Sequence, residues 1–467
     1  MSEQTDAWLN SSDSKDYFEL LRMPSVGADP NHLRDCVQTA TWLRKWLGKI
    51  GAEAELVLPG AVGAGDPALS VPVVVGERLS PEAGTTVLVY GHYDVQPADP
   101  LDAWQTPPFE PTVRDDRVFC RGAQDDKGQL FAFLCGVRAF LAEKPGAVNL
   151  KFVFEGQEES GSTGLLKLLE DRAFRQRISA DVLLVCDTSA GAGLRPAIVA
   201  GLRGVCHMTV QLTGAPGDLH SGEYGGLAPN AAQAMCELVA SLHNPDGAIA
   251  VAGFRDGIVP PTHDELVKAE EGLLPSDGSG DIEARFRAEI GVEPCGGQRG
   301  KTIAQRVCFE PPIEVNGIHA GYGGPGSKTI IPSTAVAKLS MRLVPGQSPR
   351  AAYDAVRTHL KDHAPRGMTL SFPEEGGLSG AMRLPLASPI FRLAADVLAE
   401  LDPRGAVFQW DGASIPVISA LKEASGAAPL LVGWGQAEDR IHAPNESYSV
   451  AQFGKAKRWA QTILSAL

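Results

Sequence analysis

The chain has 467 residues, of which 44% are hydrophobic and 21% charged, as is typical of a soluble globular protein large enough for two domains. The formal net charge of −14 at pH 7 excludes nucleic acid and anionic membrane surfaces as expected partners, because both select basic proteins. The chain contains no run of about 18 apolar residues, so no membrane-spanning helix is expected. Residues 1–6 do not have the pattern of a signal peptide.

The first 200 residues alternate between helical and strand patterns. Helical periodicity covers residues 13–23, 31–50, 128–143 and 165–174, and strand-like apolar runs cover residues 71–75, 86–90, 148–155 and 180–186. This alternation predicts an α/β layer with a mostly parallel sheet, in which ligands bind at the carboxyl ends of the strands.

The pattern changes after Gly204. Strands are predicted at residues 205–212, 336–343 and 368–372, and helices at residues 231–242 and 349–363. This order is a split βαβ pattern of a small α+β domain, whose remaining strand we assign to residues 249–251. Residues 253–325 have little periodicity and are interpreted as an irregular insertion.

The α/β pattern resumes near the C-terminus, with helices at residues 390–401 and 450–464 and a strand at residues 428–432. We therefore predict a discontinuous α/β domain, residues 1–200 and 382–467, interrupted by a smaller α+β domain, residues 201–381. The eight cysteines form no Cys-x-x-Cys pair, and three of them lie inside apolar runs. Buried, reduced thiols and a cytoplasmic location are expected.

Five polar segments carry histidines and carboxylates, and strand-like runs precede most of them. They contain His92 with Asp94, Asp125 with Asp126, Glu158 with Glu159, Asp187, and His442. Such side chains suit a divalent metal, zinc above all. The number of candidate ligands fits two metals that share a bridging carboxylate better than it fits one.

Each segment also has a structural interpretation. Asp125 or Asp126 can be a helix N-cap, the adjacent glutamates a solvated turn, Asp187 a turn former, and His442 a structural residue that opens the last helix. The coincidence of all five favours a metal-dependent amide hydrolase.

Spacing within two segments suggests roles. Residues two apart on a strand point the same way, so Asp94 is placed to accept the ring proton of His92. Neighbouring glutamates diverge, so one of Glu158 and Glu159 can bind metal while the other acts as general base.

Taken in order, the segments resemble the di-zinc metallopeptidase family of carnosine dipeptidase, acetylornithine deacetylase and succinyl-diaminopimelate desuccinylase. The resemblance rests on residues 91–95, 122–128, 156–161, 187 and 441–446. It implies that His92 and Asp187 bind one metal, that Glu159 and His442 bind the other, and that Asp125 bridges both.

The same resemblance assigns the remaining parts of the site. Glu158 matches the general base and Asp94 the orienting acid, and a cis peptide is expected after Asp125. The α+β domain matches a ferredoxin-like lid and dimerisation domain.

Residues 217–226 resemble the dipeptidase branch, in which the histidine that matches His220 reaches the active site of a dimer partner. Thr329, Arg342 and Ser414 match substrate-binding positions of that branch, and Arg342 suits a bidentate grip on a free carboxylate. Ala413 departs from the branch, which commonly has a second glycine there, and its methyl group would narrow the pocket.

The resemblance therefore implies a cytoplasmic, homodimeric metallodipeptidase that hydrolyses small dipeptides with a free carboxylate. A water bridging two divalent metals would attack, with Glu158 as general base. Zinc is the expected metal, and manganese and cobalt suit the same ligands. The first alternative is an N-acyl amino acid deacylase or desuccinylase with the same site. A non-catalytic metal-binding scaffold is the second, although a scaffold needs no Glu158.

Overall fold

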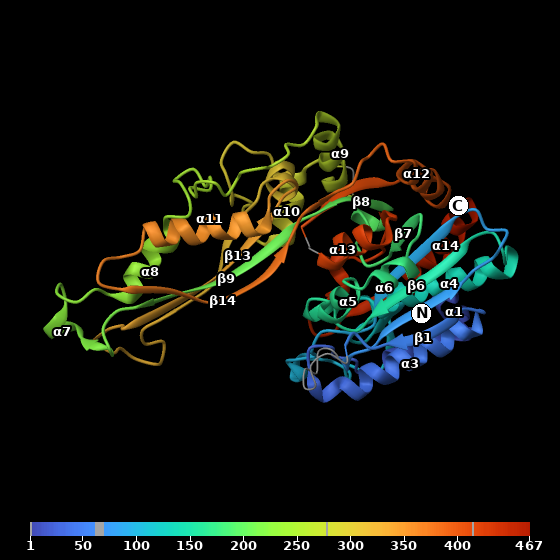
Figure 1. Cartoon of the computed structure of the whole chain (residues 1–467), viewed down its shortest axis with the longest axis horizontal. Helices are drawn as coiled ribbons and strands as arrows, with labels where there is room; N and C mark the ends of the chain where they lie inside the picture. The colour runs from blue at the N-terminus through green and yellow to red at the C-terminus, as the bar shows by residue number, and fades with distance from the viewer. Residues whose placement is uncertain (1, 61–69, 277–278, 413–414) are drawn as a thin grey trace.

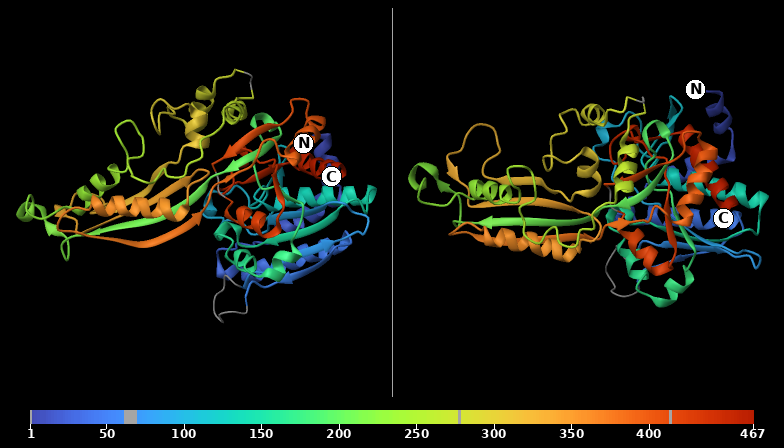
Figure 2. Two further views of the ribbon diagram at one scale, coloured as in Figure 1. Left: turned by 45° about the horizontal axis from the view of Figure 1, so that its top comes forward. Right: turned by 90° about the horizontal axis from the view of Figure 1, so that it is seen from above.

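The chain is seen in a computed structural model that describes residues 2–60, 70–276, 279–412 and 415–467. Both termini lie in an α/β part, from which an elongated second part projects (Figure 1). The same separation is visible in both further views (Figure 2).

A six-stranded sheet organises the α/β part. Its strand order is β1-β2-β6-β3-β7-β17, and the last four strands are mutually parallel. Strands β1 and β2 form an antiparallel edge. The apolar runs of β3 and β7 are buried on both faces, as in other parallel sheets covered by helices. The strands are β1 (Glu53–Val57), β2 (Val73–Arg78), β3 (Thr86–His92), β6 (Asn149–Glu155), β7 (Val182–Val185) and β17 (Ala428–Leu431).

Helices cover this sheet and bury its apolar side chains. Helix α4 is apolar nearly all round because it packs beside α14 and against Trp46 of α3. The helices of this part are α1 (Glu3–Leu9), α2 (Ser12–Leu21), α3 (Leu33–Lys49), α4 (Lys127–Glu143), α5 (Thr163–Leu168), α6 (Arg172–Arg177), α12 (Pro389–Leu401), α13 (Pro416–Ser425) and α14 (Val450–Ala466).

Two three-stranded sheets complete the α/β part, in the orders β15-β8-β16 and β18-β5-β4. Their strands are β4 (Thr112–Arg114), β5 (Arg117–Phe119), β8 (Ala197–Leu202), β15 (Met382–Arg383), β16 (Val407–Asp411) and β18 (Ser447–Ser449). The predicted fold class, an α/β part with a mostly parallel sheet, is confirmed.

The second part, called the lid here, contains an antiparallel sheet in the order β11-β13-β9-β14. The chain order β9-α8-β11-β13-α11-β14 is the ferredoxin-like arrangement. Helix α7 lies at the far end (Figure 1), next to the two-stranded antiparallel sheet β10-β12. The lid elements are β9 (Gly204–Thr213), β10 (Leu219–His220), α7 (Ser221–Tyr224), α8 (Ala231–Ala240), β11 (Ile313–Ala320), β12 (Ile330–Ile331), β13 (Thr334–Leu343), α11 (Pro349–Asp362) and β14 (Thr369–Ser379).

Two predictions for the insertion are wrong. Residues 253–325 contain α9 (His263–Leu273) and α10 (Ile282–Ile290), and the missing lid strand is β11 rather than residues 249–251. A capping box of Thr262 and Glu265 starts α9. Most of β11 is exposed, so it lacks the alternation that marks a half-buried strand.

The helix predicted over residues 165–174 is two helices. Asp171 accepts a hydrogen bond from the Ala173 amide and starts α6, so the pattern breaks between α5 and α6. Six cysteines are buried as predicted, whereas Cys236 and Cys295 are exposed, and none forms a disulfide.

The α/β part and the lid each have their own hydrophobic core. Three side chains from the middle of the chain, those of Ala269, Ala304 and Cys308, nevertheless pack into the α/β cluster. The domain boundaries at residues 200 and 382 remain a prediction. Within residues 253–325, some side chains pack into the core of the α/β part, whereas β11 belongs to the lid sheet. Among the described residues, no helix is long and apolar enough to cross a membrane.

Candidate metal centre

The candidate ligands meet at one edge of the parallel sheet. His92 is the last residue of β3, Asp187 lies two residues beyond β7, and Glu158 and Glu159 follow β6. Asp125 lies in the loop before α4. The carboxyl ends of parallel strands thus gather side chains that are far apart in the sequence.

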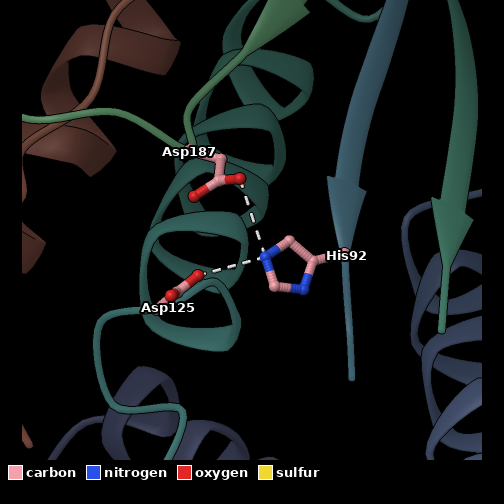
Figure 3. Close-up of side chains that lie close together, drawn as sticks. All are labelled: His92, Asp125 and Asp187. Atoms are coloured by element: carbon pink, nitrogen blue, oxygen red, sulfur yellow. Dashed lines mark hydrogen bonds and ion pairs between the residues drawn. The ribbon is translucent and has the colours of Figure 1, made fainter. Parts of the chain in front are cut away.

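One triad consists of His92, Asp125 and Asp187, whose ligand atoms lie within 4.8 Å of one another. The Nε2 atom of His92 is 3.1 Å from Asp125 Oδ1 and 3.6 Å from Asp187 Oδ2. The three side chains converge on one point (Figure 3). Two carboxylates and an imidazole facing each other in this way can hold a divalent cation.

A second triad shares Asp125. It adds Glu159 and His442, again with ligand atoms within 4.8 Å of one another. The Nε2 atom of His442 is 2.8 Å from Asp125 Oδ2 and 3.4 Å from Glu159 Oε2. Because each Asp125 oxygen faces a different histidine, the carboxylate is placed between two candidate sites.

Asp94 ties the two triads together. Its Oδ1 is 3.3 Å from His92 Nδ1 and accepts a hydrogen bond from the Glu158 amide at 3.1 Å. Its Oδ2 accepts one from the Glu159 amide at 3.1 Å. The His92 Nδ1 atom also lies 3.1 Å from the backbone carbonyl oxygen of Asp94, so Asp94 fixes the ring through both its backbone and its side chain. The fully buried Asp94 carboxylate also fixes the turn that carries both glutamates.

Glu158 is set apart from the ligands. Among the described residues its side chain makes no hydrogen bond or ion pair, while the charges of His92, Asp187 and Glu159 act on it. Burial raises the pKa of Glu158 to about 9 in the metal-free chain. A bound cation lowers the pKa of a neighbouring carboxyl group, which would bring Glu158 toward the range of a general base.

The electrostatics of the centre fit a bound cation. Burial raises the pKa of Asp187 to about 7, and the neighbouring carboxylates of Asp125 and Glu159 add to this rise. Burial also opposes the charge on Asp125, but hydrogen bonds from His442 and His92 hold the pKa of Asp125 below its usual range. The buried Glu159 Oε1 has no hydrogen-bond partner among the described residues. A cation would satisfy this oxygen and offset the excess negative charge.

The loop before α4 is held by Glu446, a residue to which sequence reasoning gave no role. The fully buried Glu446 carboxylate accepts hydrogen bonds from the amides of Gly122, Gln124 and Asp125 at 2.9, 2.9 and 3.1 Å. It also binds the Arg121 guanidinium at 2.8 Å. The only sequence signal was its place four residues after His442. The expected cis peptide joins Asp125 and Asp126.

Replacing Glu446 with glutamine should weaken metal binding about 10- to 100-fold. The side-chain NH2 group of glutamine would face backbone N–H groups whose hydrogen bonds the carboxylate accepts, so the loop that carries Asp125 would be held less firmly. Isothermal titration of the metal-free protein with zinc measures this. Glu265→Gln is the matched control: Glu265 is also buried, pairs with Arg383 and accepts a hydrogen bond from the Thr262 amide at 2.7 Å, but it lies in α9 and none of these contacts is with a residue of the metal centre. Equal zinc affinities in the two variants would contradict the expected role of Glu446.

Zinc affinity should rise with pH. Hydrogen bonds to Asp125 and Glu159 raise the pKa of metal-free His442 to about 10, so its Nε2 is protonated at neutral pH. A metal must displace this proton, and lowering the pH should weaken binding about tenfold per pH unit for each displaced proton. Titrations between pH 6 and pH 8, in buffers of different ionisation enthalpy, measure the released protons. A pH-independent affinity would contradict this assignment.

The prediction that His442 opens the last helix is wrong. His442 lies in a turn, eight residues before α14, with φ of 59°. Arg440 and Asn445 on either side also have positive φ, of 56° and 64°. The tight turn, and not a helix, directs the imidazole toward Asp125.

The predicted substrate-binding residues fall into two groups. The Thr329 carbonyl accepts a hydrogen bond from the Ser221 amide at 3.0 Å, next to His220 at the N-terminus of α7. Arg342 pairs with Val205 at the other end of the lid sheet, about 25 Å along β13 from Thr334. Within one chain, α7 is far from the α/β part (Figure 1). Ser414 and Ala413 lie outside the described residues.

Comparison with known proteins identifies the family. The model of "Peptidase family M20/M25/M40" matches residues 88–466. The chain belongs to this family. It is 30% identical to the Cys-Gly metallodipeptidase dug1 of Schizosaccharomyces pombe over 93% of this chain and 90% of the relative. It is also 30% identical to the human Beta-Ala-His dipeptidase, over 94% of this chain and 82% of the relative.

A solved structure of an M20 family enzyme has the same fold as this M20/M25/M40 peptidase. The M20 family metallo-carboxypeptidase Sso-CP2 from Sulfolobus solfataricus superimposes with a TM-score of 0.83 and is 26% identical, covering 97% of this chain and 98% of that chain. The predicted family, its metallopeptidase class and its fold are thus confirmed.

Proposed function

We propose that this chain is a two-metal dipeptidase that hydrolyses the amide bond of small dipeptides with a free carboxylate. The observation that carries the proposal is the position of Asp125 between His92 and His442, which builds two cation sites around one carboxylate. The names of the two dipeptidase relatives support the substrate class. Neither relative is named as an N-acyl amino acid deacylase or desuccinylase, so that alternative is not favoured.

His92 and Asp187 would hold one metal, Glu159 and His442 the other, and Asp125 both. Bound divalent metals supply an acidified water and polarise the scissile carbonyl. Zinc is proposed first, and manganese and cobalt suit the same ligands.

The chain's own residues perform the proton transfers and the positioning. Glu158 takes the proton of the attacking water and returns it to the leaving amine. Asp94 keeps the His92 ring and the Glu158 backbone in place through the contacts described above. Arg342 and Ser414 are proposed to bind the substrate carboxylate and to select short substrates, and Thr329, which lies beside His220 at the far end of the lid, would join them only from a second copy of the chain.

A homodimer is proposed because His220 lies too far from the α/β part to act within its own chain. His220 is exposed at the start of α7, and exposed apolar side chains near it, Tyr224 and Leu227, are available for contact with a second copy. His220 of that copy would stabilise the oxyanion. A cytoplasmic location is proposed on the basis of the eight unpaired cysteines.

Hydrolysis of a substrate panel tests the proposal. The metal-stripped protein is reloaded with zinc or manganese and given α-dipeptides, a β-alanyl dipeptide, a tripeptide, and N-acetyl and N-succinyl amino acids, with and without chelator. We expect metal-dependent cleavage of dipeptides and none of N-acyl amino acids. The reverse pattern would assign the chain to the deacylases, and no turnover would favour the non-catalytic scaffold.

A further inference from the structure

A side chain outside both triads contacts one of the proposed metal ligands. Gln96 lies two residues after Asp94 and is half-buried. Its Nε2 atom donates a hydrogen bond to Glu159 Oε2 at 2.7 Å. Only the NH2 end of a side-chain amide can donate to a carboxylate, so the chemistry of this contact fixes which way the Gln96 amide points.

The bond from Gln96 can hold Glu159 both before and after a metal binds. In the metal-free chain, Glu159 Oε2 also faces His442 Nε2 at 3.4 Å, and the buried Oε1 has no partner among the described residues. When His442 binds a metal through Nε2, this nitrogen no longer donates to Glu159. A carboxylate oxygen has two lone pairs, so Oε2 can bind a metal and still accept the hydrogen bond from Gln96.

The loop that carries Gln96, residues 96–105, is fixed to the rest of the α/β part. Three side chains donate hydrogen bonds to its backbone carbonyls, namely Arg121 to Pro97 at 3.2 Å, Trp104 to Ala98 at 2.7 Å and Asn445 to Ala103 at 2.9 Å. Asn445 also belongs to the turn that carries His442. The loop is therefore connected to both Glu159 and His442, the two ligands that only the second triad contains.

The contact is specific to the second triad, and its donor is neutral. Among the described residues, Gln96 makes no hydrogen bond to His92 or Asp187 of the first triad. A neutral amide satisfies the Glu159 oxygen without adding a positive charge, whereas a lysine or arginine at this position would repel a bound cation.

We infer that Gln96 is a positioning residue for the second metal site, and that it acts through Glu159 to raise the metal affinity of that site alone. The inference rests on the proposed function, which places one metal in each triad. Loss of a residue that hydrogen-bonds to a metal ligand lowers metal affinity by about 10- to 100-fold. Gln96→Leu removes the donor and keeps a side chain of similar size, so it should weaken the second site by about this factor.

Variants that impair one site allow the other to be measured by itself. Asp187→Asn impairs the first site and Glu159→Gln the second, and Gln96→Leu is added to each of them. Competition between the full chain and a chromogenic chelator for zinc measures the affinity of the intact site. We expect Gln96→Leu to weaken zinc binding about 10- to 100-fold in the Asp187→Asn protein. No change is expected in the Glu159→Gln protein, because the partner of Gln96 is already altered there.

Gln461→Leu is the matched control, tested in the same two proteins. Gln461 is also half-buried, and its Nε2 atom donates to Glu143 Oε1 at 2.8 Å, so the bond removed is of the same kind. Glu143 is the last residue of α4, about 24 Å along the helix from the end that follows Asp125. Gln461→Leu should leave both zinc affinities unchanged.

The outcomes separate this inference from the proposed function. If the wild-type chain binds fewer than two zinc ions, the proposed function is wrong. If it binds two, but Gln96→Leu and Gln461→Leu give equal affinities at the second site, only the inference about Gln96 is wrong. Equal losses at both sites in Gln96→Leu would also overturn it, because Gln96 would then support the fold of the whole centre.

Discussion

Replacement of Glu158 by glutamine is expected to lower kcat by about 10²- to 10⁴-fold while two metals remain bound. Glutamine keeps the size of the side chain but accepts no proton from the attacking water. Metal retention is expected because Glu158 belongs to neither triad. Steady-state kinetics and elemental analysis of the same preparation measure the two effects.

Glu159→Gln is the control for this experiment, because the same change is made one residue along the chain. Glu159 Oε2 faces His442 in the second triad, so this variant should lose one metal. Glu158→Gln protein that holds two metals and retains more than a few per cent of wild-type turnover would show that another group is the base.

Replacement of Asp125 by asparagine is expected to weaken binding at both metal sites by more than about 100-fold. Loss of a residue that only hydrogen-bonds to a metal ligand lowers metal affinity by about 10- to 100-fold, and the loss of a ligand to both metals should exceed this. In Asp125, one carboxylate oxygen faces His92 and the other faces His442. Asparagine removes the negative charge and replaces one of these two oxygens with an NH2 group. Competition with a chromogenic chelator measures the affinity at each site and the number of ions bound.

Variants of residues that belong to only one triad serve as controls for this prediction. Asp187→Asn should weaken only the site with His92, and Glu159→Gln only the site with His442, because each residue belongs to one triad. An Asp125→Asn protein that loses one ion and keeps the other at wild-type affinity would show that Asp125 does not bridge. Unchanged circular dichroism of the metal-free variants would exclude general unfolding as the cause.

The segments of the metal centre could be predicted because each has a local cause. Apolar strands end in polar residues at one edge of a parallel sheet, and both the strand pattern and the polar residue are visible in the sequence. His92 after β3 and Glu159 after β6 are of this kind. The two-residue spacing of His92 and Asp94 likewise predicted a contact that the structure contains.

Other features depend on contacts between distant parts of the chain. Glu446 binds amides more than 320 residues away in the sequence, and no local pattern marks such a partner. The turn at His442 requires three residues with positive φ, none of them glycine. Strand β11 carries a register shift between Val315 and Gly317 and is largely exposed, so its apolar residues do not alternate.

Diffraction data collected at the zinc absorption edge from crystals of the zinc-loaded protein would test the central claim most directly. We expect two anomalous peaks per chain, one within the triad of His92, Asp125 and Asp187 and one within the triad of Asp125, Glu159 and His442. Both should lie about 2.0–2.2 Å from an Asp125 oxygen. A single peak, or two peaks that do not share Asp125, would contradict a two-metal mechanism.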